Sequence, residues 1–477
     1  MELKELLKYY TSHPSVIGLR EKITESGAAK ISLKGLTGSS PAVVLAATYQ
    51  INPFSTIAIL SDREEAAYFF DDLNALGLEE NVLFFPSSYR RSFVHERIES
   101  ENIIFRTEVL NKLALDESGY IVVTYPEAIM EKVISGSGLA KNTLHIRKGD
   151  KLSISFINEV LFDYGFERVE FVYEPGQYSL RGSIIDIFSF SNEDPYRVDF
   201  FGDEIDSIRT FDIEDQISKE TLTRISIIPN IQEGLHNEKR VSLFDFLDEK
   251  MIIAAKSFTY VLAQIKQLQH EAAEKFSDDE MADMVILGKE FKSGITPYTC
   301  VEFGSAHYFN PVEELIFNTS KQPIFNKNFD MLGLNLKTNR QKGYRNILLT
   351  SSPKQIERLH AIFDDKGDPQ KIDSLLFAIN EGFIDHDLKI CCYTDHQIFE
   401  RYHRFNLRSK KSSRQAITIK ELSKLHPGDF VVHIDHGVGK FAGLVKTEVN
   451  GNIQEAIRLI YRDNDSLLVS IHSLHRI

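Results

Sequence analysis

The sequence predicts a multidomain α/β protein, and three observations lead to this prediction. The chain has 477 residues, which corresponds to roughly three domains at about 150 residues each. Apolar runs alternate with helical patterns in residues 1–142 and again beyond residue 230. Short strands separated by turn signals fill residues 143–229 and 425–477. We therefore expect a β-rich module inserted into one α/β domain, a second small α/β domain and a small terminal β-barrel.

The first α/β segment, residues 1–142, contains apolar runs of strand length separated by amphipathic patterns such as DREEAAYFFDDLNALG. The runs predicted as strands are Ala42–Tyr49, Thr56–Leu60, Val82–Pro86 and Tyr120–Thr124. Buried strands that alternate with helices are typical of a parallel sheet with crossover helices. Residues 230–320 continue this domain, because EKMIIAAKSFTYVLAQIKQLQHEAAEKF predicts a strand followed by a long helix.

The remaining segments differ from one another in pattern. Residues 143–229 alternate short strands with turn signals, which predicts the β-rich module. Residues 321–408 repeat a strand–helix rhythm in NILLTSS, PKQIERLHAIFDD, LLFAINEGF and LKICCYTD, which predicts the second α/β domain. After a connector at 409–424, residues 425–477 alternate apolar and polar side chains around the hairpin signal Asn450–Gly451, which predicts the barrel.

Composition and charge narrow the class of protein. A hydrophobic fraction of 42%, a charged fraction of 26% and a net charge of −14 are typical of a soluble globular protein and disfavour a general polyanion-binding surface. Three cysteines without a CxxC pattern exclude a disulfide framework and a structural zinc site. The sequence contains no signal-like segment and no apolar run of about 18 residues. We therefore expect a cytoplasmic protein without membrane contact.

Residues 401–424 form the clearest compositional shift in the chain. Eight basic residues stand there against Glu421 alone, a net charge of +7. We interpret this stretch as a solvated basic linker between domains. Contact with nucleic-acid phosphate is the alternative.

The segment KGLTGSSPA, residues 34–42, has the layout of a phosphate loop without its chemical groups. If the pattern GxxxxGK[ST] starts at Gly35, Ser40 takes the position of the second glycine, Pro41 that of the lysine and Ala42 that of the hydroxyl residue. A phosphate loop needs the lysine to neutralise charge and the hydroxyl to hold Mg²⁺. We therefore predict a turn built on Gly35 and Gly38 that binds no nucleotide, and no cofactor in this chain.

The β-rich module is acidic, yet it places arginine beside an aromatic residue. Nine basic and seventeen acidic residues occur in 143–229. In PYRVDFFG, the period of two puts Arg197, Asp199 and Phe201 on one strand face, which we expect to be the solvent face. Arg181 heads the neighbouring strand. Exposed arginine beside an aromatic is typical of a protein-binding hot spot, and a structural ion pair of Arg197 is the alternative.

Other motifs carry less chemistry. The pair in His433-Ile-Asp-His436 has metal-ligand character, but no third ligand stands at a useful spacing, so we predict a loop and no metal site. Neither a GxSxG elbow nor an HExxH helix occurs, and no paired-carboxylate site can be defined. We therefore name no catalytic residue.

Two long segments of the chain resemble one protein family. VYEPGQYSLRGSIIDIFSF and PYRVDFFGDEIDSIRTFD are similar to the domain shared by the excision-repair protein UvrB and the bacterial transcription-repair coupling factors. HPGDFVVHIDHGVGKFAG and YRDNDSLLVSIHSLHRI are similar to the RNA-polymerase-interacting module of those coupling factors, which is related to CarD-type regulators. With the degenerate loop upstream, the chain resembles the N-terminal part of a coupling factor, with a RecA/UvrB-like first domain and an SH3/Tudor-like barrel at residues 425–477.

This resemblance implies a role in transcription-coupled DNA repair. Members of the family bind stalled RNA polymerase through its β subunit, recruit UvrA, and displace the polymerase by ATP-driven translocation on double-stranded DNA. The family's UvrA-binding pattern falls on Arg181, Arg197 and Phe201. Its polymerase contact falls on Leu444, Val445, Lys446 and Thr447, although relatives can carry leucine in place of Thr447. The alternative for Leu444 and Val445 is a place in the core of the barrel itself.

The family places two RecA-like ATPase domains directly after the polymerase-binding module. This sequence contains no intact GxxxxGK[ST] pattern, so we expect that the chain is a monomer, that it is not itself an enzyme, and that ATP and Mg²⁺ belong to motor domains beyond Ile477. Two other functions remain open. One is a UvrB-type nucleotide-dependent enzyme that handles damaged DNA, and the other is a CarD-like transcription regulator that uses only the terminal barrel.

Overall fold

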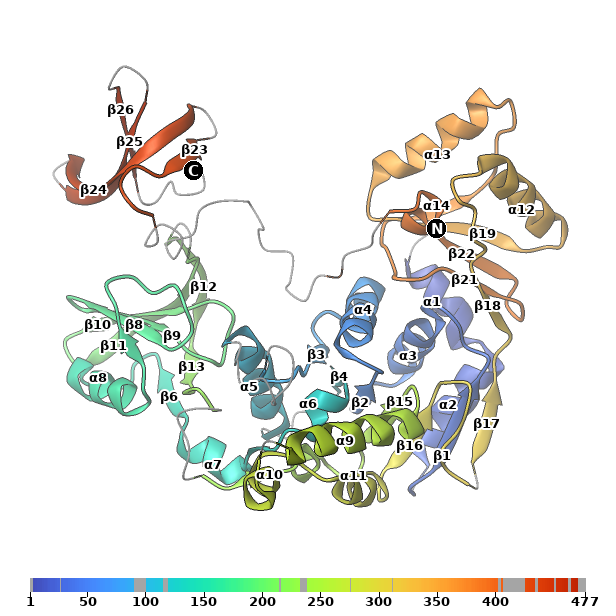
Figure 1. Ribbon diagram of the computed structural model, residues 1–477, viewed down its shortest axis with the longest axis horizontal. Coiled ribbons are helices and arrows are strands. Elements are labelled where there is room, and N and C mark those ends of the chain that lie inside the picture. Colours follow the sequence, from blue (N-terminus) through green and yellow to red (C-terminus); the bar gives the residue numbers. More distant parts are fainter. Residues whose placement is uncertain are drawn as a thin grey trace. The chain divides into compact units, whose positions relative to one another are not determined.

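The computed structural model describes residues 3–25, 27–89, 100–114, 119–213, 216–231, 238–274, 276–310, 312–401, 405, 425–433, 436–449, 452–461 and 465–470. The chain divides into two compact units, residues 1–136 with 239–407 and residues 137–238 with 408–477. Figure 1 labels the helices and strands of both units. Within the described ranges, no helix has both the length and the apolar character needed to cross a membrane.

The first unit contains a seven-stranded parallel sheet with the strand order β17-β1-β16-β15-β2-β4-β3. Strands from before and after the inserted module alternate in this sheet, because β15 and β16 lie between β1 and β2. The predicted parallel sheet is therefore confirmed, as is the strand and long helix predicted after residue 249. The strands are β1 (Lys30–Lys34), β2 (Thr56–Ile59), β3 (Val82–Phe84), β4 (Ile121–Thr124), β15 (Ile252–Ala255), β16 (Thr299–Glu302) and β17 (Glu313–Ile316).

Helices cover both faces of this sheet. Ala254 and Val301 are paired in register and face a cavity lined also by α2 and α3. The neighbouring Cys300 points to the other face, where its thiol donates to the carbonyl of Ile295 at 3.3 Å. The helices are α1 (Leu3–Thr11), α2 (Pro14–Thr24), α3 (Ser40–Ile51), α4 (Arg63–Leu73), α5 (Ser100–Ala114), α6 (Pro126–Met130), α9 (Phe258–Ala273), α10 (Asp278–Met284) and α11 (Gly288–Ile295). Shorter elements are a π-helical turn (Asn74–Leu78), a 3-10 turn (Leu243–Phe246) and the paired strands β5 (Val133–Ile134) and β14 (Arg240–Val241).

The prediction of a strand at Ala42–Tyr49 is wrong, because this run belongs to helix α3. Nearly all its side chains are buried, and an apolar run that is buried all round shows no period that separates strand from helix. Pro41 lies in the first turn of α3, where its fixed φ angle favours the start of a helix.

The same unit contains a second, mixed sheet of five strands in the order β18-β21-β22-β19-β20. β19, β20 and β22 run parallel, whereas β18 and β21 are antiparallel to their neighbours. Of the predicted LLFAINEGF element only the two ends lie in strands. The elements are β18 (Thr319–Lys321), α12 (Phe329–Gln341), β19 (Arg345–Leu349), α13 (Pro353–Asp365), β20 (Asp373–Leu375), β21 (Phe383–Asp385), β22 (Ile390–Thr394) and α14 (Asp395–Ile398).

In the second unit, the β-rich module is a six-stranded sheet in the order β12-β11-β10-β9-β8-β7. Helix α8 packs on one face through Ile157 and Leu161, which join a core with Ile185, Ile187 and Val198. The elements are α7 (Gly136–Lys141), β6 (Leu144–Arg147), α8 (Ile154–Asp163), β7 (Glu167–Arg168), β8 (Gln177–Arg181), β9 (Ile184–Phe188), β10 (Tyr196–Phe201), β11 (Glu204–Phe211), β12 (Ser218–Leu222) and β13 (Arg224–Ile227), which pairs with β6.

The terminal segment is an antiparallel meander in the order β23-β24-β25-β26. Its strands are β23 (Phe430–His433), β24 (Gly437–Val449), β25 (Asn452–Ile460) and β26 (Ser466–Ser470). A small core gathers Val431, Phe441, Ile457, Leu459 and Val469. The residues described here form an open sheet with β23 and β26 at its edges, and a closed barrel is not found among them.

Candidate interaction surfaces and the degenerate phosphate loop

Arg197 lies on the sheet face of the module that is opposite to α8, and its guanidinium is held on all sides. Its Nε and Nη2 donate to the two carboxylate oxygens of Asp186 at 2.7 and 2.9 Å. Nη1 donates to the carbonyl of Gln216 at 3.1 Å, and the guanidinium lies 4.2 Å from the ring centre of Phe211. The side chain is only 14% exposed. The expected solvent face is therefore largely covered at Arg197, in the manner of the structural ion pair left open as the alternative.

Arg181 binds the same carboxylate. Its Nη2 forms an ion pair with Asp186, whose side chain is 1% exposed, while Arg181 itself stays partly open to solvent. The register explains this meeting, because Asp186 lies opposite Arg197 on β10 and Ile184 lies opposite Arg181 on β8. The structure thus brings Arg181 and Arg197 together around one buried acid, so that the trio carries a net positive charge.

Phe201 ends β10 and is 84% exposed. The burial along Tyr196–Phe201 alternates as predicted, with Val198 and Phe200 in the core. A register shift between Asp199 and Phe200 breaks the pairing with β11 just before this end of the strand. Phe201 is therefore an apolar side chain projecting from the same face that carries the two arginines.

Sequence reasoning missed the acid and the cradle around Arg197. Asp186, Phe211 and Gln216 were not singled out, although all three contact the Arg197 guanidinium. The sequence does contain a signal for Asp186. If the strands before and after the turn at residues 192–195 pair as a hairpin, Asp186 lies opposite Arg197, as it does in the structure. Nothing in the local sequence marks Gln216, whose backbone has a positive φ of 61°.

In the terminal sheet, the predicted polymerase contact falls on the outer half of β24. β23 pairs with β24 only between Gly437 and Lys440, whereas β25 pairs with it up to Val449. Beyond Lys440, the opposite edge of β24 has no strand partner among the described residues. Leu444 is about half exposed there and Val445 is partly buried. The backbones of Lys446 and Thr447 pair with Glu455 and Gln454.

Of the predicted loop His433–His436, His436 lies in a turn, whereas His433 belongs to a strand. His433 ends strand β23 and is buried, with its ring centre 4.8 Å from that of His436 in the following turn. The two residues between them, 434 and 435, lie outside the described residues, as does nearly all of the basic run 401–424.

One set of potential metal ligands occurs in the part of the chain that is described: atoms of His13, Asp385 and Asp387 lie within 4.8 Å of one another. However, Nδ1 of His13 accepts the amide hydrogen of Ser15 at 3.1 Å. In the neutral ring, Nε2 therefore carries the proton, and it lies 3.6 Å from Asp387. Asp385 already accepts from Tyr10 and from the amide of Leu388. Nδ1 of His13 and both carboxylate oxygens of Asp385 are thus engaged in hydrogen bonds, whereas Nε2 of His13 is buried and has no hydrogen-bond partner within the described residues.

The loop between β1 and α3 contains two glycines in the left-handed region and one hydrogen bond within the loop. Gly35 and Gly38 have positive φ angles of 83° and 56°, which glycine adopts without strain. The amide of Thr37 donates to Oγ of Ser40 at 2.9 Å, and Ser40 is fully buried. Pro41 lies in the first turn of α3 and has no amide hydrogen to offer.

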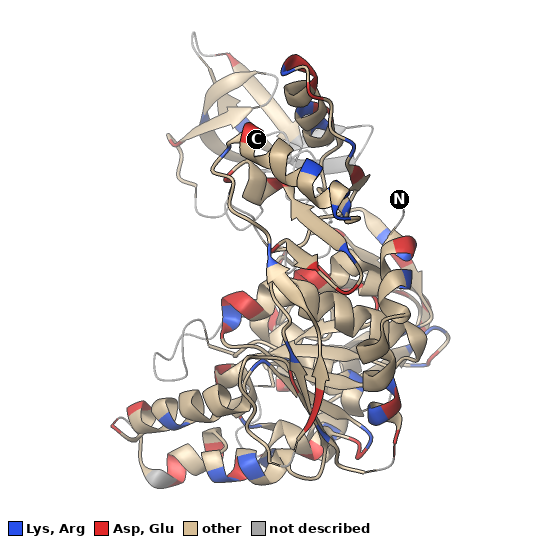
Figure 2. Ribbon diagram, turned by 90° about the vertical axis from the view of Figure 1, so that its right-hand side faces the viewer, with Lys and Arg blue, Asp and Glu red and all other residues tan. Residues whose placement is uncertain are grey.

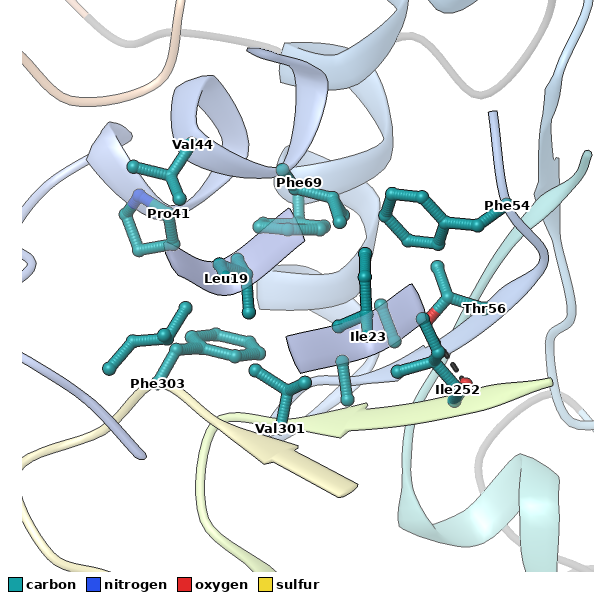
Figure 3. A pocket seen from close by; sticks show the side chains of 14 residues that line it. Leu19, Ile23, Pro41, Val44, Phe54, Thr56, Phe69, Ile252, Val301 and Phe303 are labelled. Atoms are coloured by element: carbon teal, nitrogen blue, oxygen red, sulfur yellow. Dashed lines mark hydrogen bonds between the residues drawn. The ribbon is translucent and has the colours of Figure 1, made fainter. Parts of the chain in front are cut away.

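Below Pro41 lies a cavity of about 30 Å³ between α2, α3 and the sheet (Figure 3). Its walls are apolar, and the hydroxyl of Thr56, the polar side chain in the lining, donates to the carbonyl of Ile252 at 3.0 Å. A nucleotide needs several hundred Å³ and convergent polar groups. This cavity therefore cannot serve as a nucleotide site.

Acidic and basic side chains interleave along the helices that face the viewer in Figure 2. Two charged residues of α12 form ion pairs: Lys337 with Asp368 and Asp330 with Lys366, both at 2.6 Å.

Comparison with known families defines the class of protein. Residues 144–232 match the family model described as the UvrB interaction domain, and residues 425–477 match the CarD-like/TRCF RID domain. The chain thus combines a module related to UvrB with a module related to CarD.

The chain is also similar to proteins named transcription-repair-coupling factors. The chain is 23% identical to that of Bacillus subtilis over 568 residues, which cover 100% of the chain and 47% of the relative. It is 24% identical to that of Escherichia coli over 519 residues, covering 93% of the chain and 44% of the relative. The chain spans about half the length of these curated relatives. The resemblance predicted from the sequence is confirmed along the whole chain.

Proposed function

We propose that this chain is the part of a transcription-coupled DNA repair factor that binds UvrA and RNA polymerase. The observation that carries the proposal is the pairing of a UvrB interaction domain with a CarD-like/TRCF RID domain in one chain. The first domain is proposed to bind UvrA and the second to bind the β subunit of stalled RNA polymerase in the cytoplasm, as a monomer.

The UvrA contact is proposed at Phe201, Arg181 and Arg197. Supporting geometry is the projecting Phe201 beside two arginines whose guanidinium groups share Asp186. An exposed aromatic with adjacent arginine is the composition of binding hot spots. Because Arg197 is held by Asp186 and Phe211, its replacement would disturb the module, and a binding test should rest on Phe201.

Retention of UvrA by the immobilised full chain tests this contact. Phe201→Ala is expected to weaken binding at least about tenfold, the loss typical of a hot-spot aromatic. Phe162→Ala is the matched control, because Phe162 is 74% exposed and lies on α8, on the opposite side of the sheet. Equal retention of UvrA by both variants would contradict the assignment of this surface.

The polymerase contact is proposed along Leu444, Val445, Lys446 and Thr447. The edge of β24 beyond Phe441, which has no strand partner among the described residues, supports it, because an edge strand can add to a sheet of another protein. Closure of the terminal sheet into an SH3/Tudor-like barrel belongs to the same proposal. Leu444→Arg should abolish capture of the polymerase β subunit, whereas Leu468→Arg, at a similarly exposed site on β26, should preserve it.

ATP-driven translocation on double-stranded DNA is proposed to belong to other segments of such a factor. Within this chain, the loop at Gly35–Ala42 has proline and alanine at the lysine and hydroxyl positions. Calorimetric titration of the full chain with ATP and Mg²⁺ is expected to show no binding. Binding at micromolar concentration would instead favour a UvrB-type nucleotide-dependent enzyme.

A further inference from the structure

The loop that resembles a phosphate loop is occupied by another part of the same unit. The amide of Ser39 donates to the carbonyl of Glu381 at 3.1 Å, and the amide of Glu381 donates back to Oγ of Ser39 at 2.9 Å. In a nucleotide-binding protein, loop amides of this kind point at phosphate oxygens. Here the carbonyl of Glu381 takes the place of the anionic oxygen. The two hydrogen bonds between Ser39 and Glu381 fix how the two segments are aligned.

The approach between the two segments is too close for a side chain. A Cβ added to Gly38 would lie 2.8 Å from the carbonyl oxygen of Gly382. A Cβ on Gly382 would lie 2.0 Å from Oε1 of Gln322 and 2.6 Å from the carbonyl oxygen of Cys392. The contact therefore requires glycine at Gly38 in the loop, whereas at Gly382 the room for a side chain is taken by Gln322 and Cys392 of its own domain.

A third group closes the contact from helix α4. Oδ1 of Asp72 accepts the amide hydrogen of Asn380 at 2.6 Å, and the carboxyl also bonds with Ser39. Asp72 is 4% exposed, so this bond is shielded from water. Successive amides of the segment, those of Asn380 and Glu381, are thus both bound by side chains of the first α/β domain.

The opposite side of the loop is bound in a similar way. The hydroxyl of Thr319 donates to the carbonyl of Gly35 at 2.7 Å and lies 2.9 Å from the hydroxyl of Thr37. Thr319 begins β18, and Asn380–Gly382 leads into β21, the strand that pairs with β18. Both sides of the loop therefore grip the same edge of the five-stranded sheet.

We propose that the Gly35–Ser40 loop is a peptide-binding site, and that its resident ligand is Asn380–Gly382, which latches the α/β domain of residues 319–398 onto the first α/β domain. The ligand class is an extended backbone that offers two successive amides and a carbonyl and ends in glycine. The loop, which has the sequence layout of a phosphate loop, thus serves a contact that needs no nucleotide.

Hydrogen exchange at the Glu381 amide in the full chain tests the latch. The wild-type amide is expected to be protected, and Ser39→Ala, which removes its acceptor, should raise its exchange rate about tenfold. Ser293→Ala is the matched control, because the Ser293 hydroxyl bonds only within its own helix, to the carbonyl of Glu290. Exchange of the Leu348 amide in β19 should stay unchanged in both variants, which shows that the domain remains folded.

The second part of the experiment adds anions that would compete with the Asn380–Gly382 segment for the loop. Neither inorganic phosphate nor ATP with Mg²⁺ at millimolar concentration should accelerate exchange at Glu381. An unprotected Glu381 amide in the wild-type chain, an unchanged rate in Ser39→Ala, or acceleration by either anion would overturn the proposal. An unprotected Glu381 amide or an unchanged rate in Ser39→Ala does not bear on UvrA or polymerase binding, so the latch can fail while the proposed function stands. Acceleration by ATP would count against both the latch and the proposed function.

Discussion

Asp186 is expected to hold the arginine pair of the module together, and its replacement by asparagine should therefore be costly. The carboxylate is 1% exposed and binds Arg197 through both oxygens and Arg181 through one. Asp186→Asn keeps the shape but removes the charge and puts an NH₂ group against a guanidinium. Arg181 can turn back to solvent, whereas Arg197, at 14% exposed, cannot.

The magnitude follows from this asymmetry. Removing one partner of a buried ion pair costs about 3–5 kcal/mol. Arg197 keeps its bond to Gln216 and its contact with Phe211, so we expect about 3 kcal/mol, the lower end of that range. The matched control is Asp199→Asn in the same sheet. Asp199 pairs with Arg209, and both are partly exposed, so about 1 kcal/mol or less is expected.

Native-state hydrogen exchange of the β9 and β10 amides in the full chain measures both variants. Asp186→Asn should lower the free energy of opening of these strands by about 3 kcal/mol, and adding Arg197→Met should recover most of the loss, because the buried cation is removed with its partner. If Asp186→Asn cost no more than Asp199→Asn, Arg197 would be solvated in the folded module and the structural account of its cradle would be wrong.

Three further predictions concern the first unit. Burial raises the pKa of Asp72 from its ordinary value of 3.8 to about 8, against the lowering effect of Ser39 and the Asn380 amide, and Asp71 and Glu381 raise it further. Folding therefore favours the protonated acid, so stability should fall as pH rises from about 4 to about 8; thermal unfolding at pH 5 and pH 8 should differ less in Asp72→Asn than in the wild type. Gly382→Ala should lower the thermal midpoint strongly, because its Cβ would overlap Gln322 and Cys392; an unchanged midpoint would show that the segment can move aside. Ala58→Val, which fills the cavity below Pro41, should be neutral or stabilise by about 1 kcal/mol in denaturant unfolding, whereas Ala47→Val, at a fully buried site outside its lining, should destabilise by about 1–3 kcal/mol.

Local patterns in the sequence predicted much of the fold. The alternation in Tyr196–Phe201 correctly placed Val198 and Phe200 in the core and Phe201 at the surface, since strand periodicity depends only on neighbouring residues, although the expected solvent face is largely covered at Arg197. The run Ala42–Tyr49 was assigned wrongly because burial on all sides removes that periodicity. Local signals therefore gave the two faces of β10 but did not separate helix from strand in the run Ala42–Tyr49.

Long-range contacts were beyond the reach of the sequence. The lack of a lysine at Pro41 predicts that the loop binds no nucleotide, but it gives no hint that Glu381, 342 residues from Ser39, lies on it. The same applies to Gln216, whose contact with Arg197 depends on a residue with a positive φ angle. Such partners are set by the packing of whole domains.

The burial of Arg197 does not weaken its proposed part in UvrA binding; it changes what that part is. A free arginine loses side-chain entropy when a partner fixes it. Arg197 is already fixed by Asp186, Gln216 and Phe211, and Asp186 also pairs with Arg181. Phe201 projects from the same face of the sheet, and its side chain is 84% exposed. A partner would therefore meet a rigid charged platform and gain most of its energy by covering one aromatic ring, which is why Phe201 separates binding from folding more cleanly than either arginine.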